Sequence, residues 1–129
     1  IAKVASGGEL SRLMLCIKSL VAQKMNLPTL IFDEINTGIS GEAAKQVGII
    51  MYQLAQGRQV ICITHQPQIA AKAQQHLYVY KQAAANGAVT TNIKLLNTDE
   101  SITAIAQMLG GENPSEAALA SAREMKTMV

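Results

Sequence analysis

The stretch Thr29-Leu30-Ile31-Phe32-Asp33-Glu34 decides the fold class of this 129-residue chain. A short run of strand-forming apolar residues that ends abruptly in two acids is typical of a strand buried on both faces of a parallel sheet. Residues 59–64 (QVICIT) form a second run of this kind, which ends on Thr64 and His65. We therefore expect an α/β fold in which the two stretches are neighbouring parallel strands.

Helices are predicted on either side of the first strand. Apolar residues recur at intervals of three and four over residues 9–25, and Asn26 and Pro28 end this pattern. A similar pattern over residues 43–54, ended by Gly57, predicts a helix between the two strands. A strand, a helix and a strand in this order form a right-handed unit whose strand ends lie at one edge of the sheet. The acids at 33–34 and the polar pair at 64–65 are therefore expected to converge.

The rest of the chain predicts a short helix, a hairpin and two closing helices. The short helix covers about 67–73, and the hairpin joins residues 76–81 to 89–96 through a turn at Asn86-Gly87. A helix over about 99–109 should face inward and stop at Gly110. The last helix should open with Asn113 as its cap and Pro114 at its first position. The inward residues of the first closing helix are expected to be Ile102, Ile105, Ala106 and Leu109.

Composition excludes several classes of function. Hydrophobic residues make up 49% of the chain, which favours a globular fold, and no apolar run approaches the roughly 18 residues that cross a bilayer. The net charge of +2 is spread along the chain and aromatic residues are only 3%, so neither a nucleic-acid footprint nor a base-stacking platform is indicated. Cys16 and Cys62 belong to no CxxC pair, which favours buried, reduced thiols in a cytoplasmic protein. Because the chain starts at Ile1, we expect a piece of a longer protein.

Asp33 and Glu34 are the first candidates for chemistry. A carboxylate at the end of a buried strand can hold magnesium, which prefers oxygen ligands and keeps several waters. A neighbouring carboxylate can orient or deprotonate an attacking water. The alternative is that the two acids are simply solvated where the strand becomes a loop.

Ser6-Gly7-Gly8-Glu9 and His65 are the other candidates. Two glycines at a helix start expose backbone N–H groups at the positive end of the helix dipole, where an anion can bind. His65 follows the second strand, where an imidazole can donate to a phosphate oxygen. An ordinary helix cap and an ordinary surface histidine are the alternatives, and His76 receives no role. Taken together and in this order, the three features indicate a site that handles phosphate.

The sequence resembles the SMC-like group of ABC ATPases, over essentially its whole length. Residues 5–12 (ASGGELSR) look like the signature loop, residues 30–34 (LIFDE) like Walker B with its catalytic glutamate, and Thr64-His65 like the switch-histidine loop. The position of the D-loop is occupied by Thr37, Gly38, Ile39 and Ser40. The implied fold is the C-terminal lobe of a P-loop ATPase head, with parallel strands flanked by helices, a terminal hairpin and two helices, all in one lobe, 1–129.

This resemblance also implies roles, cofactors and partners. Asp33 would bind magnesium, Glu34 would position the attacking water, and His65 would contact the γ-phosphate of ATP bound to its own head. The signature residues would contact ATP on the opposing head, and the D-loop would line the interface of the two heads. These signature residues are Ser6, Gly7, Gly8 and Glu9. ATP would then hold together two heads of a DNA double-strand-break repair protein. This protein would lie in the cytoplasm, at the nucleoid, where its full-length form would bind DNA without contacting a membrane.

Two departures from the family pattern stand out. Asn36 occupies a place where the family usually has aspartate, which puts the coupling across the dimer in question. No Gly-x-x-x-x-Gly-Lys-Ser/Thr loop occurs in the sequence, so this loop should lie in an N-terminal lobe of the same protein and the isolated chain should be inactive. Two alternatives stay open: a self-contained magnesium-dependent phosphohydrolase or nuclease, for which further acids such as Glu42, Asp99 and Glu100 are poorly placed, and a non-catalytic interaction module.

Overall fold

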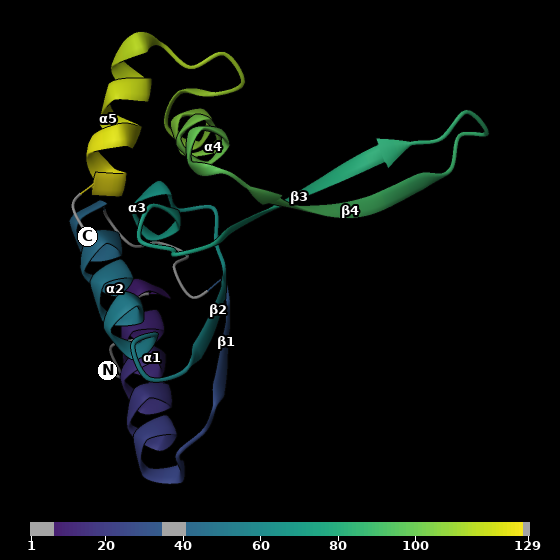
Figure 1. Cartoon of the computed structure of the whole chain (residues 1–129). Helices are drawn as coiled ribbons and strands as arrows, with labels where there is room; N and C mark the ends of the chain where they lie inside the picture. The colour runs from purple at the N-terminus through teal and green to yellow at the C-terminus, as the bar shows by residue number, and fades with distance from the viewer. Residues whose placement is uncertain (1–6, 35–40, 128–129) are drawn as a thin grey trace, which may run out of the picture. The chain divides into compact units, whose positions relative to one another are not determined.

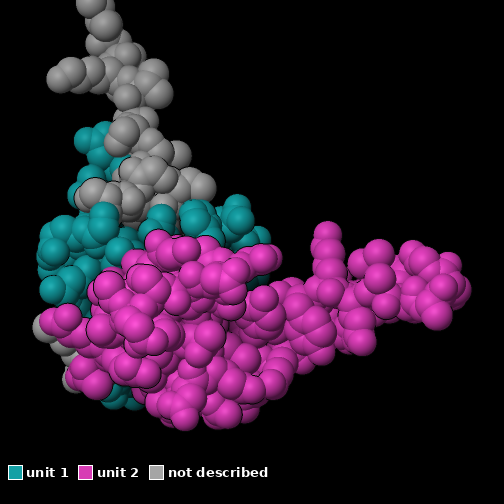
Figure 2. All heavy atoms as spheres, turned by 90° about the horizontal axis from the view of Figure 1, so that it is seen from above, with its two compact units in different colours: residues 1–72 teal, residues 73–129 magenta. Residues whose placement is uncertain are grey.

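The computed structural model of this chain describes residues 7–34 and 41–127. The chain divides into two compact units, residues 1–72 and residues 73–129, which Figure 2 distinguishes by colour. Each unit has its own helices and its own pair of strands. None of the helices in the described ranges reaches the length and hydropathy that a membrane-crossing helix needs.

Unit 1 contains the predicted strand, helix and strand. Its elements are α1 (Gly7–Met25), β1 (Thr29–Asp33), α2 (Gly41–Leu54), β2 (Gln59–Ile63) and α3 (Pro67–Ala70). Strands β1 and β2 pair in parallel, in a register that runs from Thr29 opposite Gln59 to Asp33 opposite Ile63. The parallel pairing predicted from the two apolar runs is therefore confirmed (Figure 1).

The end of α1 follows from two residues. Asn26 has a left-handed backbone with φ of 51°, and the Leu27 N–H donates back to the carbonyl oxygen of Ala22 over 3.2 Å. This six-to-one bond ends a helix by satisfying a carbonyl group that would otherwise lack a partner, and asparagine tolerates the left-handed conformation better than most residues. The helix therefore stops where the sequence predicts, and the chain turns directly into β1.

The core of unit 1 lies on one face of the β1–β2 pair. Leu30 and Phe32 are buried and point toward the two long helices, while Ile31, Ile61 and Ile63 on the opposite face are exposed. The prediction that both strands are buried on both faces is wrong for the described residues, because α1 and α2 both cover the same side of the sheet. The buried cluster consists of Leu15, Ala22, Leu30, Phe32, Val47, Met51 and Ile69.

Helix α1 carries a second apolar side that nothing in the described residues covers. Leu15 and Ala22 face the core, whereas Leu20 remains 66% exposed and is one of six large apolar residues exposed along the part of this helix whose side chains are described. These six, the exposed stripe of α1, are Leu13, Met14, Ile17, Leu20, Val21 and Met25. A hollow of about 260 Å³ between α1 and β1 is lined by Ile17 and Val21 of the stripe and by Ile31 of the strand. Cys16 is also exposed, against the expectation of a buried thiol.

Unit 2 consists of the hairpin and the closing helices. Strands β3 (His76–Ala83) and β4 (Val89–Leu96) pair in antiparallel fashion, and Gly87, with φ of 81°, lies in the turn where the sequence predicts it. Helices α4 (Thr98–Gly110) and α5 (Glu116–Thr127) pack on each other and bury Ile105 and Ala122.

Three details of the closing helices differ from the prediction. Gly110 is the last residue of α4, and the left-handed residue that follows the helix is Gly111, with φ of 84°. Leu109 is 39% exposed and does not face inward. The cap of α5 is Ser115 in place of Asn113, because the Ser115 hydroxyl accepts from the Ala118 N–H over 3.2 Å.

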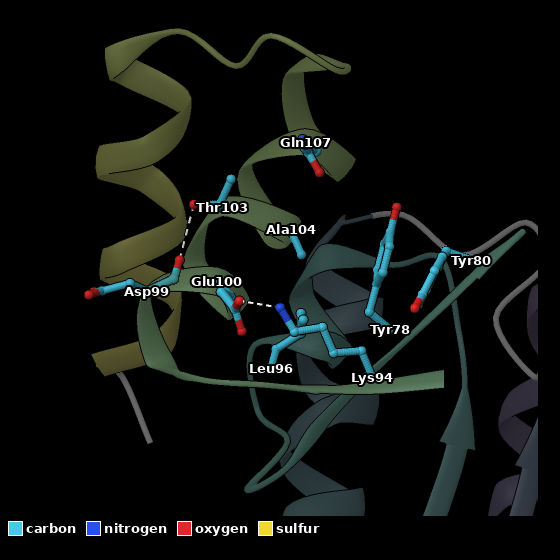
Figure 3. Close-up of a pocket in the computed structure, with 9 residues that line it drawn as sticks. All are labelled: Tyr78, Tyr80, Lys94, Leu96, Asp99, Glu100, Thr103, Ala104 and Gln107. Carbon is cyan, nitrogen blue, oxygen red and sulfur yellow. Dashed lines mark hydrogen bonds and ion pairs between the residues drawn. The ribbon is translucent and has the colours of Figure 1, made fainter. Parts of the chain in front are cut away.

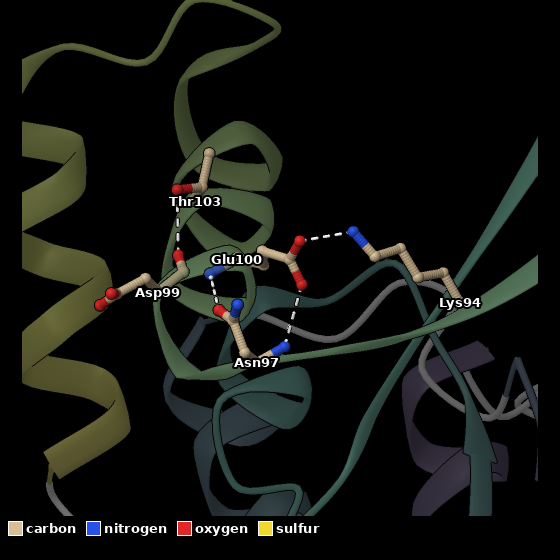
Figure 4. A network of polar contacts seen from close by, with 5 residues as sticks. All are labelled: Lys94, Asn97, Asp99, Glu100 and Thr103. Atoms are coloured by element: carbon tan, nitrogen blue, oxygen red, sulfur yellow. Dashed lines mark hydrogen bonds and ion pairs between the residues drawn. The ribbon is translucent and has the colours of Figure 1, made fainter.

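The start of α4 has a cap that the sequence prediction missed. The Asn97 side chain accepts from the Glu100 N–H over 2.9 Å, and the Glu100 carboxylate accepts in return from the Asn97 N–H over 3.0 Å. Glu100 also pairs with Lys94 of β4, and these contacts hold its pKa below the usual value (Figure 4). The helix therefore begins at Thr98 with two of its N–H groups satisfied reciprocally.

Candidate functional site

The two predicted polar ends of the strands meet at one edge of the β1–β2 pair. Asp33 lies opposite Ile63 in the register, and the Glu34 N–H donates to the Ile63 carbonyl oxygen over 3.0 Å. This bond extends the parallel ladder one step past the end of β1. The structure thus brings the backbones of 33–34 and 63–65 together, and the side chains of Asp33, Glu34 and His65 are exposed there.

Glu34 has an unusual backbone conformation. Its φ of 48° lies in the left-handed region, which costs a residue with a side chain about 1–2 kcal/mol. Glycine or asparagine is the usual occupant of such a position. A strained residue at the end of a buried strand is characteristic of functional sites, where the geometry serves a purpose other than stability. No feature of the sequence indicated this strain.

The segment after β2 is held by its own hydrogen bonds and by α3. The Gln66 N–H donates to the Thr64 hydroxyl oxygen over 3.0 Å, which fixes a tight turn around His65. Pro67 then starts α3, and the Ala70 N–H donates to the Gln66 carbonyl oxygen over 3.1 Å. His65 is therefore an exposed side chain on a short segment that is anchored at both ends.

The glycine-rich start of α1 lies at the same end of unit 1. Helix α1 runs away from this end and β1 runs back toward it, so the helix start and the ends of both strands lie at one end of the unit (Figure 1). Gly7, Gly8 and Glu9 form the first turn of α1, and the first N–H groups of a helix have no partner within the helix. Ser6 lies outside the described residues, as do the predicted D-loop residues Thr37, Gly38, Ile39 and Ser40.

The protein supplies few oxygen ligands at this end of unit 1, so a magnesium ion bound here would need phosphate and water oxygens to complete its coordination. Within the described ranges, no three His, Cys, Asp or Glu side chains form a group that could hold a metal ion. Magnesium is usually held by one or two carboxylates together with substrate phosphates and waters. Asp33, an exposed carboxylate at the end of β1, fits that pattern.

Cys62 lies next to this edge without taking part in its chemistry at neutral pH. Burial, and secondly the Asp33 carboxylate, raise the pKa of its thiol from 9.0 to about 11. The thiolate is the reactive form of cysteine, so Cys62 is inert near neutral pH. Cys62 is half-buried and forms no disulfide bond, whereas a buried thiol was expected.

Unit 2 has a hollow of its own, which the sequence did not indicate. It measures about 520 Å³ and lies between the hairpin and α4, with Tyr78 and Tyr80 along one wall (Figure 3). The two tyrosine rings are stacked, with centroids 6.1 Å apart. Glu100 at the rim is engaged by Lys94 and by the helix cap. Asp99 and Glu100, judged poorly placed for metal chemistry, lie here and belong to no metal-holding group within the described residues.

His76, which received no role from the sequence, makes a structural contact inside unit 2. Its Nδ1 shares a hydrogen bond of 2.8 Å with the hydroxyl of Ser101, a buried residue in the first turns of α4. Burial, and secondly the charge of Lys126, lower the pKa of His76. The neutral imidazole thus links β3 to α4 inside unit 2.

The chain is similar in sequence to DNA repair proteins named RecN. It is 46% identical to RecN of Vibrio cholerae over 125 residues, which cover 97% of this chain and 22% of that protein. The identity to RecN of Haemophilus influenzae is 43% over 129 residues, covering 100% of the chain and 23% of the relative. For RecN of Bacillus subtilis it is 41% over 125 residues, covering 97% and 22%. The chain thus spans less than a quarter of the length of these relatives.

Solved structures with the same fold are SMC heads, although no family model matches the chain. A chain from work on ATP-driven dimerization and DNA-stimulated activation of SMC ATPases aligns with a TM-score of 0.67 and 18% identity, covering 84% of this chain and 65% of that one. The Smc head of Pyrococcus yayanosii aligns with a TM-score of 0.67 and 20% identity, covering 83% and 20%. The chain is therefore similar, over nearly its whole length, to one segment of the RecN DNA repair proteins, and it shares the fold of the aligned part of these SMC structures.

Proposed function

We propose that this chain is one lobe of the ATPase head of an SMC-like DNA repair protein, which binds ATP between two heads and hydrolyses it. The observation that carries the proposal is the convergence of Asp33, Glu34 and the His65 segment at one edge of a parallel strand pair, fixed by the bond from Glu34 to Ile63. Ligands of open α/β sheets bind at this edge, where the strands end. The similarity to RecN supports the repair context.

The residues at this edge can meet the charge of a transferring phosphoryl group. Glu34 would orient the attacking water, and His65 would donate to the γ-phosphate of ATP on the same head. The N–H groups of Gly7 and Gly8, with Ser6 and Glu9, would bind the γ-phosphate of ATP on the opposing head. Thr37 to Ser40 would line the interface between heads. Catalysis would rest on dipoles and charges that are assembled only when the heads close.

Asp33 would hold magnesium, together with the phosphates of ATP and water. The metal would supply positive charge against the developing charge on the phosphoryl oxygens. Pairing with β2 positions both acids. Asp33 lies opposite Ile63, and the hydrogen bond from the Glu34 N–H to the Ile63 carbonyl oxygen fixes the end of β1. The remaining contacts to ATP would come from the Gly-x-x-x-x-Gly-Lys-Ser/Thr loop (the Walker A loop), which we place in another lobe of the protein.

The exposed stripe of α1 supports the existence of that lobe. Burying a large apolar side chain contributes about 1.5–3 kcal/mol, and six such side chains lie exposed along one helix. Ile31, Ile61 and Ile63 are also exposed on the face of β1 and β2 that α1 and α2 do not cover. Exposed apolar surface of this extent marks an interface. We propose that the Walker A lobe covers this exposed apolar surface. We also propose that residues 1–129 act as one lobe, and that the complete protein binds DNA in the cytoplasm, at the nucleoid.

ATP binding with and without the missing lobe tests this proposal. We expect negligible ATP binding by the isolated chain and restored binding when the Walker A lobe is added, measured by calorimetry. Tight binding by the isolated chain would favour a self-contained phosphohydrolase. An absence of binding in both cases would favour an interaction module and would refute the ATPase proposal.

Two substitutions in the full-length protein separate hydrolysis from head association. Glu34→Gln should keep ATP-dependent association, measured by light scattering, and lose turnover. Ser6→Arg should block association, because it places bulk and charge at the contact with the opposing head. Unchanged turnover in Glu34→Gln would contradict the role of this carboxylate, and ATP-driven dimers of Ser6→Arg would contradict the contact in trans.

A further inference from the structure

Gln68 in α3 has a side-chain amide whose oxygen lacks a hydrogen-bond donor among the residues that the structure describes. This oxygen, Oε1, is buried. A buried amide oxygen without a donor disfavours the folded state, and such groups in native proteins call for an explanation. Methionine has nearly the same shape as glutamine and would fill this space without an unpaired oxygen. Packing alone therefore does not account for an amide at this position.

The amide of Gln68 lies at the start of α2. A methyl group on Gly41, the first residue of α2, would lie 3.4 Å from the Gln68 Nε2 atom, so the absence of a side chain there leaves room for the amide. Helix α2 begins seven positions after Glu34 in the sequence. The side chain of Gln68 therefore reaches the helix that follows the acidic end of β1.

The backbone of α3 packs closely against α2 about two turns further along the helix, at Gly48. A methyl group on Gly48 would lie 3.1 Å from the Gln68 carbonyl oxygen, closer than such contacts normally are. Gln68 is three residues after His65, and the turn and the α3 bonds described above hold the intervening residues. Displacement of the start of α2 would therefore reach the His65 segment through Gln68.

We propose that Gln68 is a positioning residue of the ATPase site. Its amide lies against the start of α2, three residues along the chain from His65, and in this proposal its buried oxygen accepts a hydrogen bond when the nucleotide-bound state forms. This inference rests on the proposed function. It deepens that function by assigning a residue that couples the two sides of the site without touching the reacting atoms.

The test replaces Gln68 by methionine in the full-length protein. Because a small misplacement of a catalytic group slows the chemical step, we expect the kcat of ATP hydrolysis to fall by about tenfold or more in Gln68→Met. The KM for ATP should stay within about twofold and Tm should be equal or higher, because an unpaired buried oxygen has been removed. The matched control is Gln53→Met, an exposed position in α2, which should leave all three quantities unchanged.

Two outcomes would overturn the inference. One is wild-type kcat in Gln68→Met, and the other is a loss of kcat that appears together with a lowered Tm, which would assign Gln68 to the fold. If Gln68→Met does not fold, Gln68→Leu is measured by the same criteria. Glu34→Gln in the same assay separates the two levels: if it loses turnover while Gln68→Met does not, only the positioning role fails, and if it too keeps wild-type turnover, the proposed function fails.

Discussion

The left-handed backbone at Glu34 leads to a prediction that separates strain from chemistry. Glu34→Gly and Glu34→Ala both remove the carboxylate, so both should abolish ATP turnover in the full-length protein. They differ in backbone preference, because glycine adopts a φ of 48° without strain and alanine does not. We therefore expect the glycine variant to hold the end of β1 more firmly than the alanine variant.

The size of the difference follows from two opposing contributions. A left-handed conformation costs a residue with a side chain about 1–2 kcal/mol. Glycine loses more conformational freedom on folding, which costs about 0.5–1 kcal/mol relative to alanine. At the midpoints of the two ranges, the net advantage of glycine at position 34 is about 0.75 kcal/mol, within about two- to fivefold in a local opening equilibrium.

Hydrogen exchange of peptides that contain β1 and β2 measures this opening. Amide protons in 29–34 and 59–63 should exchange about two- to fivefold more slowly in Glu34→Gly than in Glu34→Ala. Equal rates, or faster exchange in the glycine variant, would show that the backbone at position 34 is not held in the left-handed region. Turnover in either variant would refute the role assigned to the carboxylate.

Three further perturbations test the packing, the electrostatics and the caps. Gly48→Ala should destabilise the protein by about 1–3 kcal/mol, measured by urea denaturation. The added methyl group would lie 3.1 Å from the Gln68 carbonyl oxygen and from Lys72 Cγ. Unchanged stability would contradict the tight packing of α3 on α2. Because folding raises the pKa of Cys62 from 9.0 to about 11, its contribution to stability should be intact below pH 9 and lost as the pH rises toward 11, and a Cys62→Ala variant that showed the same alkaline loss would exclude this cause. Asn97→Ala should cost about 1 kcal/mol, read from the same denaturation assay, because it removes the cap of α4; an unchanged midpoint would show that the cap is not needed.

Much of the fold can be predicted from local patterns. The two apolar runs that end in polar residues identify β1 and β2, and Asn86-Gly87 identifies the hairpin turn, because these signals depend only on neighbouring residues. Competing local signals explain the error at the start of α5: Asn113 and Ser115 are both good cap residues, and the structure uses Ser115. The cap at Asn97 had a recognisable spacing to Glu100 and could have been found.

The environment of the side chains could not be predicted from the same patterns. Helix α1 has apolar residues on two sides, and the sequence does not tell which side unit 1 itself covers. A strand such as β1 reads as buried on both faces whether the second face is covered within this chain or by another part of the protein. The strain at Glu34 and the unpaired oxygen of Gln68 depend on three-dimensional contacts, which leave no periodic signal in the sequence.

The exposed stripe of α1 has a consequence for how substitutions in this segment are read. Leu13→Ser or Leu20→Ser would reduce the exposed apolar surface of α1. Either substitution should therefore reduce self-association of the isolated segment. In the complete protein, Leu13→Ser and Leu20→Ser would fall at the proposed contact with the Walker A lobe and should destabilise the head. Tolerance measured on the segment alone would therefore rank these positions as harmless, whereas a survey of the intact protein would rank them among its most sensitive.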